Sequence, residues 1–240
     1  MNLVLVHGAW HDGTCWDGVR AALEAAGHGV HTPTLAGHGA DADPAATHAD
    51  CVRSVVDCIA GQSLEDVVLL GHSFGGTVIQ KAAEAVPERL ARLVFVNAFV
   101  LRDGESLTDT LPAEYARVFE QSARARDDGR MLLPFEVFRD TFIGDADLQT
   151  ARRVYAGLRP IPLALMTTPV QLKRFSRLPV PRSYLNCTED IAFPPQAGGW
   201  HPGMSTRLGV YRLVQMPGSH ESMYTRPAEL AAKIIEAGRP

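Results

Sequence analysis

The chain has 240 residues, of which 46% are hydrophobic, and a formal net charge of −4. That length suffices for one large domain with a substantial core, and the slightly acidic balance gives no reason to expect nucleic acid or an anionic membrane surface as a partner. No apolar run approaches the roughly 20 residues of a membrane span, and no basic leader precedes the first strand, so the cytoplasm is the expected compartment.

Strands and helices alternate at both ends of the chain. The segments expected to form strands are 3–6, 30–32, 66–70, 93–97, 182–187 and 211–214, and those expected to form helices are 15–26, 47–60, 77–85 and 227–237. The strands are almost continuously apolar, as strands covered on both faces are. The pattern therefore predicts an α/β fold, with a mostly parallel sheet of about six strands and helices on both faces.

The segment from Asp103 to Leu178 interrupts this alternation and is rich in Arg, Asp and Pro. Its helical candidates are 111–125, 135–142 and 147–157. We expect residues 1–240 to form a single domain in which residues 103–178, here called the cap segment, are inserted over the carboxyl ends of the strands. Its larger apolar residues either line a substrate pocket or pack within the cap: Phe119, Leu132, Leu133, Phe135, Phe138, Phe142 and Met166.

The run Gly71-His72-Ser73-Phe74-Gly75-Gly76 lies between a predicted strand and a predicted helix. Strand, G-x-S-x-G and helix together are typical of a nucleophile elbow, in which glycines let the chain turn sharply enough to raise the serine hydroxyl into a cleft. The helix N-terminus beneath the serine favours negative charge. Ser73 is therefore the candidate nucleophile.

A serine hydroxyl needs a base, and the base needs an acid that orients it. His220 follows the last predicted strand and is the candidate base, because loops at the carboxyl ends of parallel strands face the same cleft. Asp190 follows the preceding strand and is the candidate acid, with Glu189 and Asp103 as alternatives.

The remaining histidines need another interpretation. We expect His28, His31, His38 and His48 on the surface or in loops, and His72 packed beneath the elbow.

Acyl transfer also needs donors for an oxyanion. The backbone N–H of Phe74, directly after the nucleophile, is one candidate, and that of Ala9, in the loop after the first strand, is the other. Next to Ala9, Trp10 and His11 either line the pocket or only pack, while His7 is expected to hold the loop by hydrogen bonds. We find no clustered metal ligands with a suitable spacing, so neither a metal nor an organic cofactor is expected.

These motifs resemble the α/β-hydrolase superfamily, and in particular the branch of the plant methyl-ester esterases and hydroxynitrile lyases. The matching residues are 5–11, Trp16, 35–39, 71–76, 188–190 and 218–220. The resemblance implies Ser73, Asp190 and His220 as a catalytic triad, with Ala9 and Phe74 as oxyanion donors. It also implies a lysine after the catalytic histidine and a threonine in the first loop for lyase activity, where this chain has Glu221 and Gly8. Since Glu221 would disfavour an anion, lyase chemistry is not expected.

The expected function is that of a serine carboxylic ester hydrolase acting on a small, largely apolar ester or lactone. Related folds also cleave carbon–carbon bonds or enol lactones, and some act as ligand receptors without turnover, so both alternatives remain open. The sequence also leaves a homodimer open.

Overall fold

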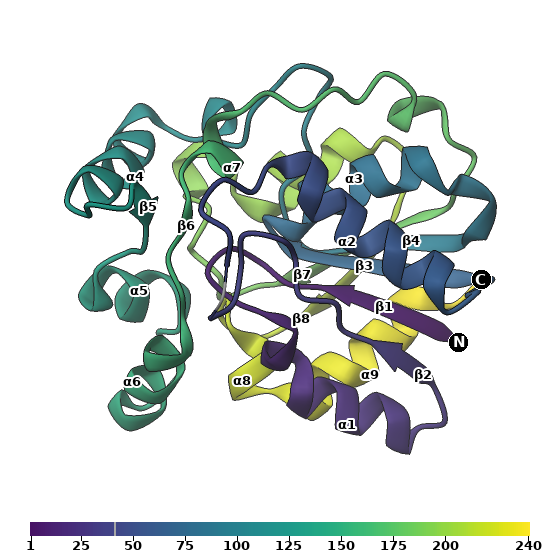
Figure 1. Ribbon diagram of the computed structural model, residues 1–240. Helices are drawn as coiled ribbons and strands as arrows, with labels where there is room; N and C mark the ends of the chain where they lie inside the picture. Colours follow the sequence, from purple (N-terminus) through teal and green to yellow (C-terminus); the bar gives the residue numbers. More distant parts are fainter. Residues whose placement is uncertain (41) are drawn as a thin grey trace.

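The structure is a computed structural model that describes residues 1–40 and 42–240. Six strands form one parallel sheet in the order β2-β1-β3-β4-β7-β8 (Figure 1). The strands are β1 (Asn2–Val6), β2 (Gly29–His31), β3 (Val67–Ser73), β4 (Leu90–Ala98), β7 (Arg182–Cys187) and β8 (Arg212–Met216). The predicted six-stranded α/β architecture is confirmed, although β3 and β4 run further than the sequence indicated.

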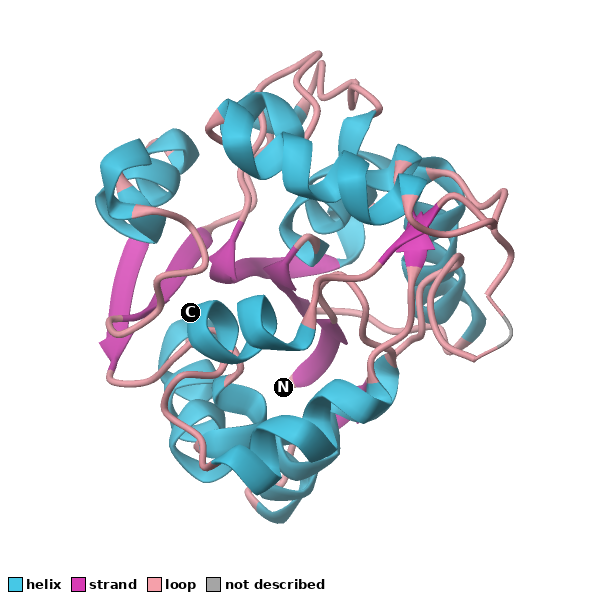
Figure 2. Ribbon diagram, turned by 90° about the vertical axis from the view of Figure 1, so that its left-hand side faces the viewer, coloured by secondary structure: helices cyan, strands magenta, loops and turns pink. Residues whose placement is uncertain are grey.

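Helices cover both faces of this sheet (Figures 1 and 2). One face carries α1 (Asp17–Ala25) and α9 (Pro227–Gly238), and the other carries α2 (His48–Gly61) and α3 (Gly75–Ala85). Successive strand residues point to opposite faces: Leu3 and Leu5 of β1 enter the core beneath α1 and α9, while Val4 and Val6 enter the core beneath α2 and α3. The central strands β1, β3 and β4 are buried on both faces almost throughout, as expected, whereas the edge strand β8 exposes one side.

The chain order reverses between β1 and β3: the chain leaves β1 toward β2 and then crosses back to β3. At such a switch point the loops after the two central strands separate and leave a crevice at the carboxyl ends. The loop after β1 and the end of β3 therefore meet at one place, and both carry candidate active-site residues.

The cap segment lies at one end of the sheet, on the left in Figure 1. Its elements are α4 (Ala113–Arg124), β5 (Arg130–Met131), α5 (Phe135–Phe142), α6 (Leu148–Gly157), β6 (Ile161–Pro162) and α7 (Ala164–Thr167). The three helical candidates correspond to α4, α5 and α6, whereas the short antiparallel pair of β5 with β6 was not predicted. Both termini lie at the opposite end of the molecule (Figure 1).

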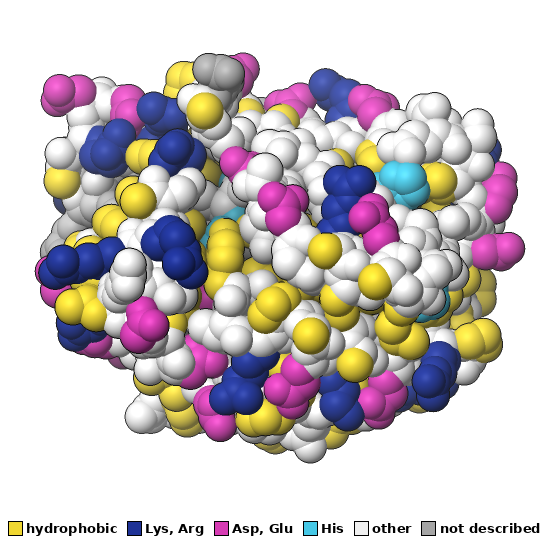
Figure 3. Space-filling model, turned by 90° about the horizontal axis from the view of Figure 1, so that it is seen from below, with side chains coloured by type: hydrophobic (Ala, Val, Ile, Leu, Met, Phe, Trp, Pro, Cys, Tyr) yellow, Lys and Arg dark blue, Asp and Glu magenta, His cyan; other side chains and the backbone are white. Residues whose placement is uncertain are grey.

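The face seen from below, on the side of α1 and α9, mixes basic and acidic side chains with scattered apolar ones (Figure 3). No helix within residues 1–40 and 42–240 combines the length and the hydropathy needed to cross a membrane. The expectations about nucleic acid, membranes and oligomeric state stay predictions.

Candidate active site

Ser73 is the last residue of β3 and has a φ of +53°, in the left-handed region that residues with side chains rarely adopt. The turn around it leaves no space for further side chains. A Cβ atom on Gly71 would lie 2.6 Å from the carbonyl oxygen of Gly75, and one on Gly75 would lie 2.7 Å from that of His7. The chain can therefore pass directly from β3 into α3, and Ser73 lines a cavity at this end of the sheet.

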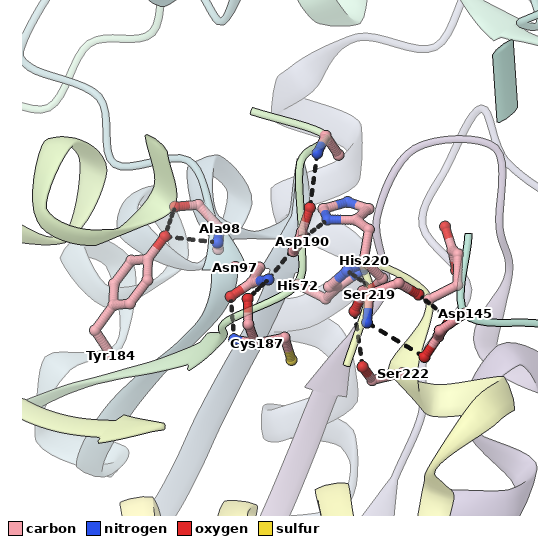
Figure 4. Close-up of polar contacts among 12 residues, drawn as sticks. His72, Asn97, Ala98, Asp145, Tyr184, Cys187, Asp190, Ser219, His220 and Ser222 are labelled. Atoms are coloured by element: carbon pink, nitrogen blue, oxygen red, sulfur yellow. Dashed lines mark hydrogen bonds and ion pairs between the residues drawn. The ribbon is translucent and has the colours of Figure 1, made fainter. Parts of the chain in front are cut away.

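His220 and Asp190 are in contact, as predicted. Nδ1 of His220 lies 2.6 Å from Oδ2 of Asp190, and both side chains are almost fully buried (Figure 4). The carboxylate also accepts hydrogen bonds from the side-chain amide of Asn97 and, at 2.8 Å, from the backbone N–H of Ala192. Three donors thus fix Asp190, which in turn fixes the imidazole ring.

Neighbouring rings restrict the His220 imidazole further. The Trp200 ring is stacked on it with centroids 5.3 Å apart, and Phe142 meets it edge-on at 5.2 Å. His72 lies on its other side and reaches the carbonyl oxygen of His220 through Nε2, at 3.1 Å. Burial holds the pKa of His72 well below its usual value, so its ring is neutral and Nε2–H donates to that carbonyl. The predicted packing of His72 beneath the elbow is confirmed.

Ser73 and His220 line the same cavity. No hydrogen bond joins them within the described part of the chain. Catalytic hydrogen bonds often form fully only when substrate is bound. The position of both side chains on one cavity therefore supports their pairing even without a hydrogen bond between them.

Ala9 and Phe74 also line this cavity. Among the described residues, neither backbone N–H has a hydrogen-bond acceptor in the protein, which leaves both free to bind an oxygen atom. His7 holds the Ala9 loop as predicted: its Nδ1 lies 2.8 Å from the carbonyl oxygen of Gly8, and its Nε2 accepts from the backbone N–H of Leu35 at 3.1 Å.

The cavity has a volume of about 410 Å³ and is lined mainly by aromatic and aliphatic side chains. Glu114 is the one acidic or basic group besides His220 among the described lining residues. The cap segment contributes most of the remaining wall. Of the apolar cap residues considered in the sequence, Phe119, Leu133, Phe142 and Met166 line the cavity, whereas Leu132, Phe135 and Phe138 do not.

Comparison with known proteins gives the family. Residues 3–233 match the alpha/beta hydrolase family. The chain belongs to this family. It is 32% identical to a carbendazim hydrolyzing esterase from Nocardioides sp. strain SG-4G, over 99% of both chains, and 28% identical to methylesterase 7 of Arabidopsis thaliana, over 98% and 95% of the two chains. Both relatives are named as ester-hydrolysing enzymes, and the second belongs to the plant branch that the motifs indicated.

A solved structure is closer still. An extracellular alpha/beta-hydrolase from a Paenibacillus species, described as structurally and functionally homologous to tobacco salicylic acid binding protein 2, is 42% identical, with a TM-score of 0.97 and full coverage of both chains. That protein is described as extracellular, while the cytoplasmic location expected for this chain stays a prediction.

The two alternative acids of this hydrolase lie elsewhere. Glu189 is exposed beside a different hollow, which it lines together with Asp140 and Asp145. Asp103 accepts a hydrogen bond from the backbone N–H of Leu172 at 2.7 Å. Of the three carboxylates, Asp190 is the one that faces His220.

Several residues around the site escaped the sequence analysis. Asn97, at the end of β4 with a φ of +36°, donates to Asp190 and accepts from the backbone N–H of Cys187 at 2.8 Å. Trp200 belongs to a short irregular helix (Gly199–Met204). An asparagine at the end of an apolar strand was the one signal available for Asn97, and nothing in the local pattern indicated Trp200.

The cap segment is also joined to the loop that carries His220 (Figure 4). Asp145 accepts from the Ser219 hydroxyl at 2.5 Å and from the Thr225 hydroxyl at 3.0 Å. The carbonyl oxygen of Phe142 accepts from the backbone N–H of Glu221 at 3.1 Å. The residues directly before and after His220 are thus both bonded to the cap segment.

Two expectations were wrong, whereas His38 lies in a loop as expected, although it is buried there. His48, the first residue of α2, is buried rather than on the surface or in a loop. Glu221 does not line the cavity: its side chain is buried and faces His11, so it does not place a negative charge where an anion would leave. The missing lysine and the glycine at position 8 still stand against lyase chemistry. Trp10 lines the cavity, whereas His11 lies outside it.

Proposed function

We propose that this chain is a serine carboxylic ester hydrolase that forms an acyl-enzyme on Ser73. One observation carries the proposal: a serine on a strained strand-to-helix turn and a histidine paired with a buried aspartate line the same, mainly apolar cavity. The family membership and the ester-hydrolysing relatives support the same reaction class.

In the first half of the reaction, the Ser73 hydroxyl oxygen attacks the ester carbonyl carbon while His220 takes the hydroxyl proton. Asp190 keeps the imidazole in the required orientation and stabilises its cation. The backbone N–H groups of Ala9 and Phe74 hydrogen-bond to the oxyanion as it develops. His220 then gives its proton to the leaving alcohol oxygen, and the carbon–oxygen bond of the ester breaks.

In the second half, His220 takes a proton from water, and the resulting nucleophile attacks the acyl group on Ser73. The same two backbone donors bind the second oxyanion. Return of the proton to Ser73 releases the carboxylic acid and restores the enzyme. Every step uses side chains and amides of this chain.

The cavity favours a small, largely apolar ester or lactone. Its volume of about 410 Å³ accommodates a substrate of modest size. The apolar walls stabilise an apolar substrate by burying it, and the exposed carboxylate of Glu114, which also lines the cavity, disfavours a negatively charged substrate. Hydroxynitrile lyase activity is not proposed, because Glu221 and Gly8 occupy the positions of the lysine and threonine that it requires.

The test is hydrolysis of a series of p-nitrophenyl esters of increasing acyl length by the wild type, by Ser73→Ala and by a control, Ser176→Ala. Ser176 is exposed in the short helix Phe175–Arg177, near the end of the cap segment, and does not line the cavity. We expect turnover in the wild type and the control, and none in Ser73→Ala, with circular dichroism unchanged. Labelling by a fluorophosphonate, located by mass spectrometry, should map to Ser73.

Turnover that survives in Ser73→Ala would contradict the acyl-enzyme mechanism. A folded wild type without ester turnover would shift the assignment to a carbon–carbon or enol-lactone substrate or, if labelling also fails, to a ligand receptor.

A further inference from the structure

Glu221, next to the proposed base His220, is a buried carboxylate that the reaction above does not use. Its side chain is only 1% exposed, and its Oε2 lies 3.1 Å from Nε2 of His11, whose side chain is 2% exposed. The two atoms are close enough for an ion pair, but their geometry does not meet that of a regular hydrogen bond. A carboxylate removed from water is strongly destabilising unless a positive charge or donors compensate it, so the identity of its partner matters.

The second ring nitrogen of His11 shows which form the ring adopts. Nδ1 lies 2.7 Å from the carbonyl oxygen of Ala9, an atom that can only accept. Nδ1 therefore carries a proton. If the ring were neutral, Nε2 would present its lone pair to the negatively charged Glu221 carboxylate, which is unfavourable. Both nitrogens have acceptors beside them, which is the arrangement of an imidazolium ion.

The electrostatics of the surroundings agree with that form. Burial by itself lowers the pKa of His11, but the Glu221 carboxylate and the hydrogen bond to the Ala9 carbonyl oxygen together act against burial, and the pKa is raised above its usual value. Asp12 adds a smaller contribution of the same sign. The other groups facing His11 are the Tyr224 ring, at 5.9 Å, and three buried histidines, His7, His38 and His72, whose pKa values are lowered.

The Ala9 carbonyl belongs to the peptide that leads into Trp10, and Trp10 has a φ of +66°. A tryptophan rarely adopts this left-handed conformation, so the turn must be held by its contacts. His11 closes that turn through Ala9, while the backbone N–H of Arg159 in the cap segment binds the carbonyl oxygen of Trp10 at 2.8 Å. The conformation of the loop that presents the Ala9 amide thus depends on His11.

We propose that His11 and Glu221 form a buried imidazolium–carboxylate pair that positions the oxyanion loop relative to the loop of the catalytic histidine. Both are positioning residues, since neither lines the cavity. The pair links the residue after His220 to the residue whose amide binds the oxyanion. The kinetic part of this inference rests on the proposed ester hydrolysis, whereas the protonation state of His11 can be measured whether or not the protein hydrolyses esters.

The first arm of the experiment measures protonation without activity. Imidazole ¹⁵N chemical shifts of His11, assigned with a His11→Asn variant, should show both nitrogens protonated at pH 7 in the wild type. In Glu221→Gln, the glutamine side-chain amide can donate to Nε2 while Nδ1–H still binds Ala9, so one proton should be lost. A neutral His11 ring in the wild type at pH 7 would overturn the proposal, whether or not the protein hydrolyses esters.

The second arm measures kcat and KM for an ester that the wild type turns over. Glu221→Leu removes the acceptor, and a shifted oxyanion loop should lower kcat roughly 10- to 100-fold with KM nearly unchanged. Glu221→Gln should keep kcat within about threefold of the wild type, because it preserves the hydrogen-bonding positions. Glu24→Gln, at an exposed ion pair with Arg20 on α1, is the matched control.

A folded Glu221→Leu variant with full kcat, or a Glu221→Gln variant as impaired as Glu221→Leu, would overturn the positioning role. If Glu221→Leu does not fold, the comparison of Glu221→Gln with the wild type in the first arm still tests the pair. A wild type without ester turnover would instead refute the proposed function, and the spectroscopic arm would keep its meaning.

Discussion

The floor and the walls of the cavity are built by two regions that hold their side chains by different means. On the floor, Ser73 lines the cavity, and Asp190 and Asn97 lie outside it and support His220. All three stand at or just beyond the ends of parallel strands, where ladder hydrogen bonds and tight turns fix the backbone. The cap segment forms the walls with short helices whose aromatic side chains are divided between its own core and the cavity. The proposed chemistry therefore lies where the backbone is most constrained, and the proposed substrate selection lies where side-chain packing can vary.

The largest effect is expected at the floor of the cavity, when the carboxylate that orients His220 is replaced. Asp190→Asn should lower kcat by about 10³- to 10⁴-fold, because an amide at this position no longer stabilises the imidazolium or its tautomer. Glu189→Gln and Asp103→Asn are the matched controls and should retain activity. Ester turnover by the three purified variants checks this, and full activity of Asp190→Asn would move the acid to another carboxylate.

Stability should also differ between the two regions. Phe95→Ala in β4 removes a fully buried ring from the sheet and should lower the free energy of unfolding by about 3–5 kcal/mol. The same truncation at Phe135, a half-buried ring of the cap segment, should have a smaller effect because less apolar area is lost. Urea unfolding of both variants measures the difference, and equal losses would contradict the comparison.

Between pH 7 and pH 5, acid sensitivity should arise from the sheet region, because residues 103–178 contain no histidine and carboxylates titrate at lower pH. Burial lowers the pKa values of His38 and His48 to about 4. Protonation of such groups favours the unfolded state, so the folded state has its full stability above the unfolded pKa of about 6.5 and loses on the order of 3 kcal/mol for each group as the pH falls toward 4. Thermal unfolding at pH 7 and pH 5 should therefore show a lower Tm at pH 5.

A variant separates this effect from general acid denaturation. His48→Gln can still donate to the Thr77 hydroxyl, which His48 contacts at 3.0 Å, but it does not titrate. Its Tm should fall less between pH 7 and pH 5 than that of the wild type. An identical fall would show that His48 contributes nothing to the acid limb.

The smallest expected effect concerns the walls. Val137 lines the cavity and is 38% exposed, so a larger side chain can enter the cavity without displacing a packed core. Val137→Phe should lower kcat/KM for long-chain esters about tenfold relative to acetate, with Tm unchanged. Val210→Phe, at a fully exposed position away from the cavity, should leave the chain-length preference as it is.

Short sequence patterns predicted the strands and the candidate active-site residues, because these depend on neighbouring residues in the chain. The apolar runs gave the strands, and G-x-S-x-G between a strand and a helix gave Ser73. His220 and Asp190 followed from their positions after strands. Contacts between distant segments were not predictable in this way. His11 meets Glu221 across 210 positions of the chain, and His48 becomes buried only because α2 packs on α3.

The absence of space at Gly71 and Gly75 has a consequence for how such an enzyme can diversify. A single added methyl group at either position would lie too close to backbone atoms, so substitutions there disrupt the turn and are not retained. The side chains of the cap segment border open space and can be exchanged one at a time. Descendants of one ancestral chain can therefore acquire new substrates while inheriting the same turn.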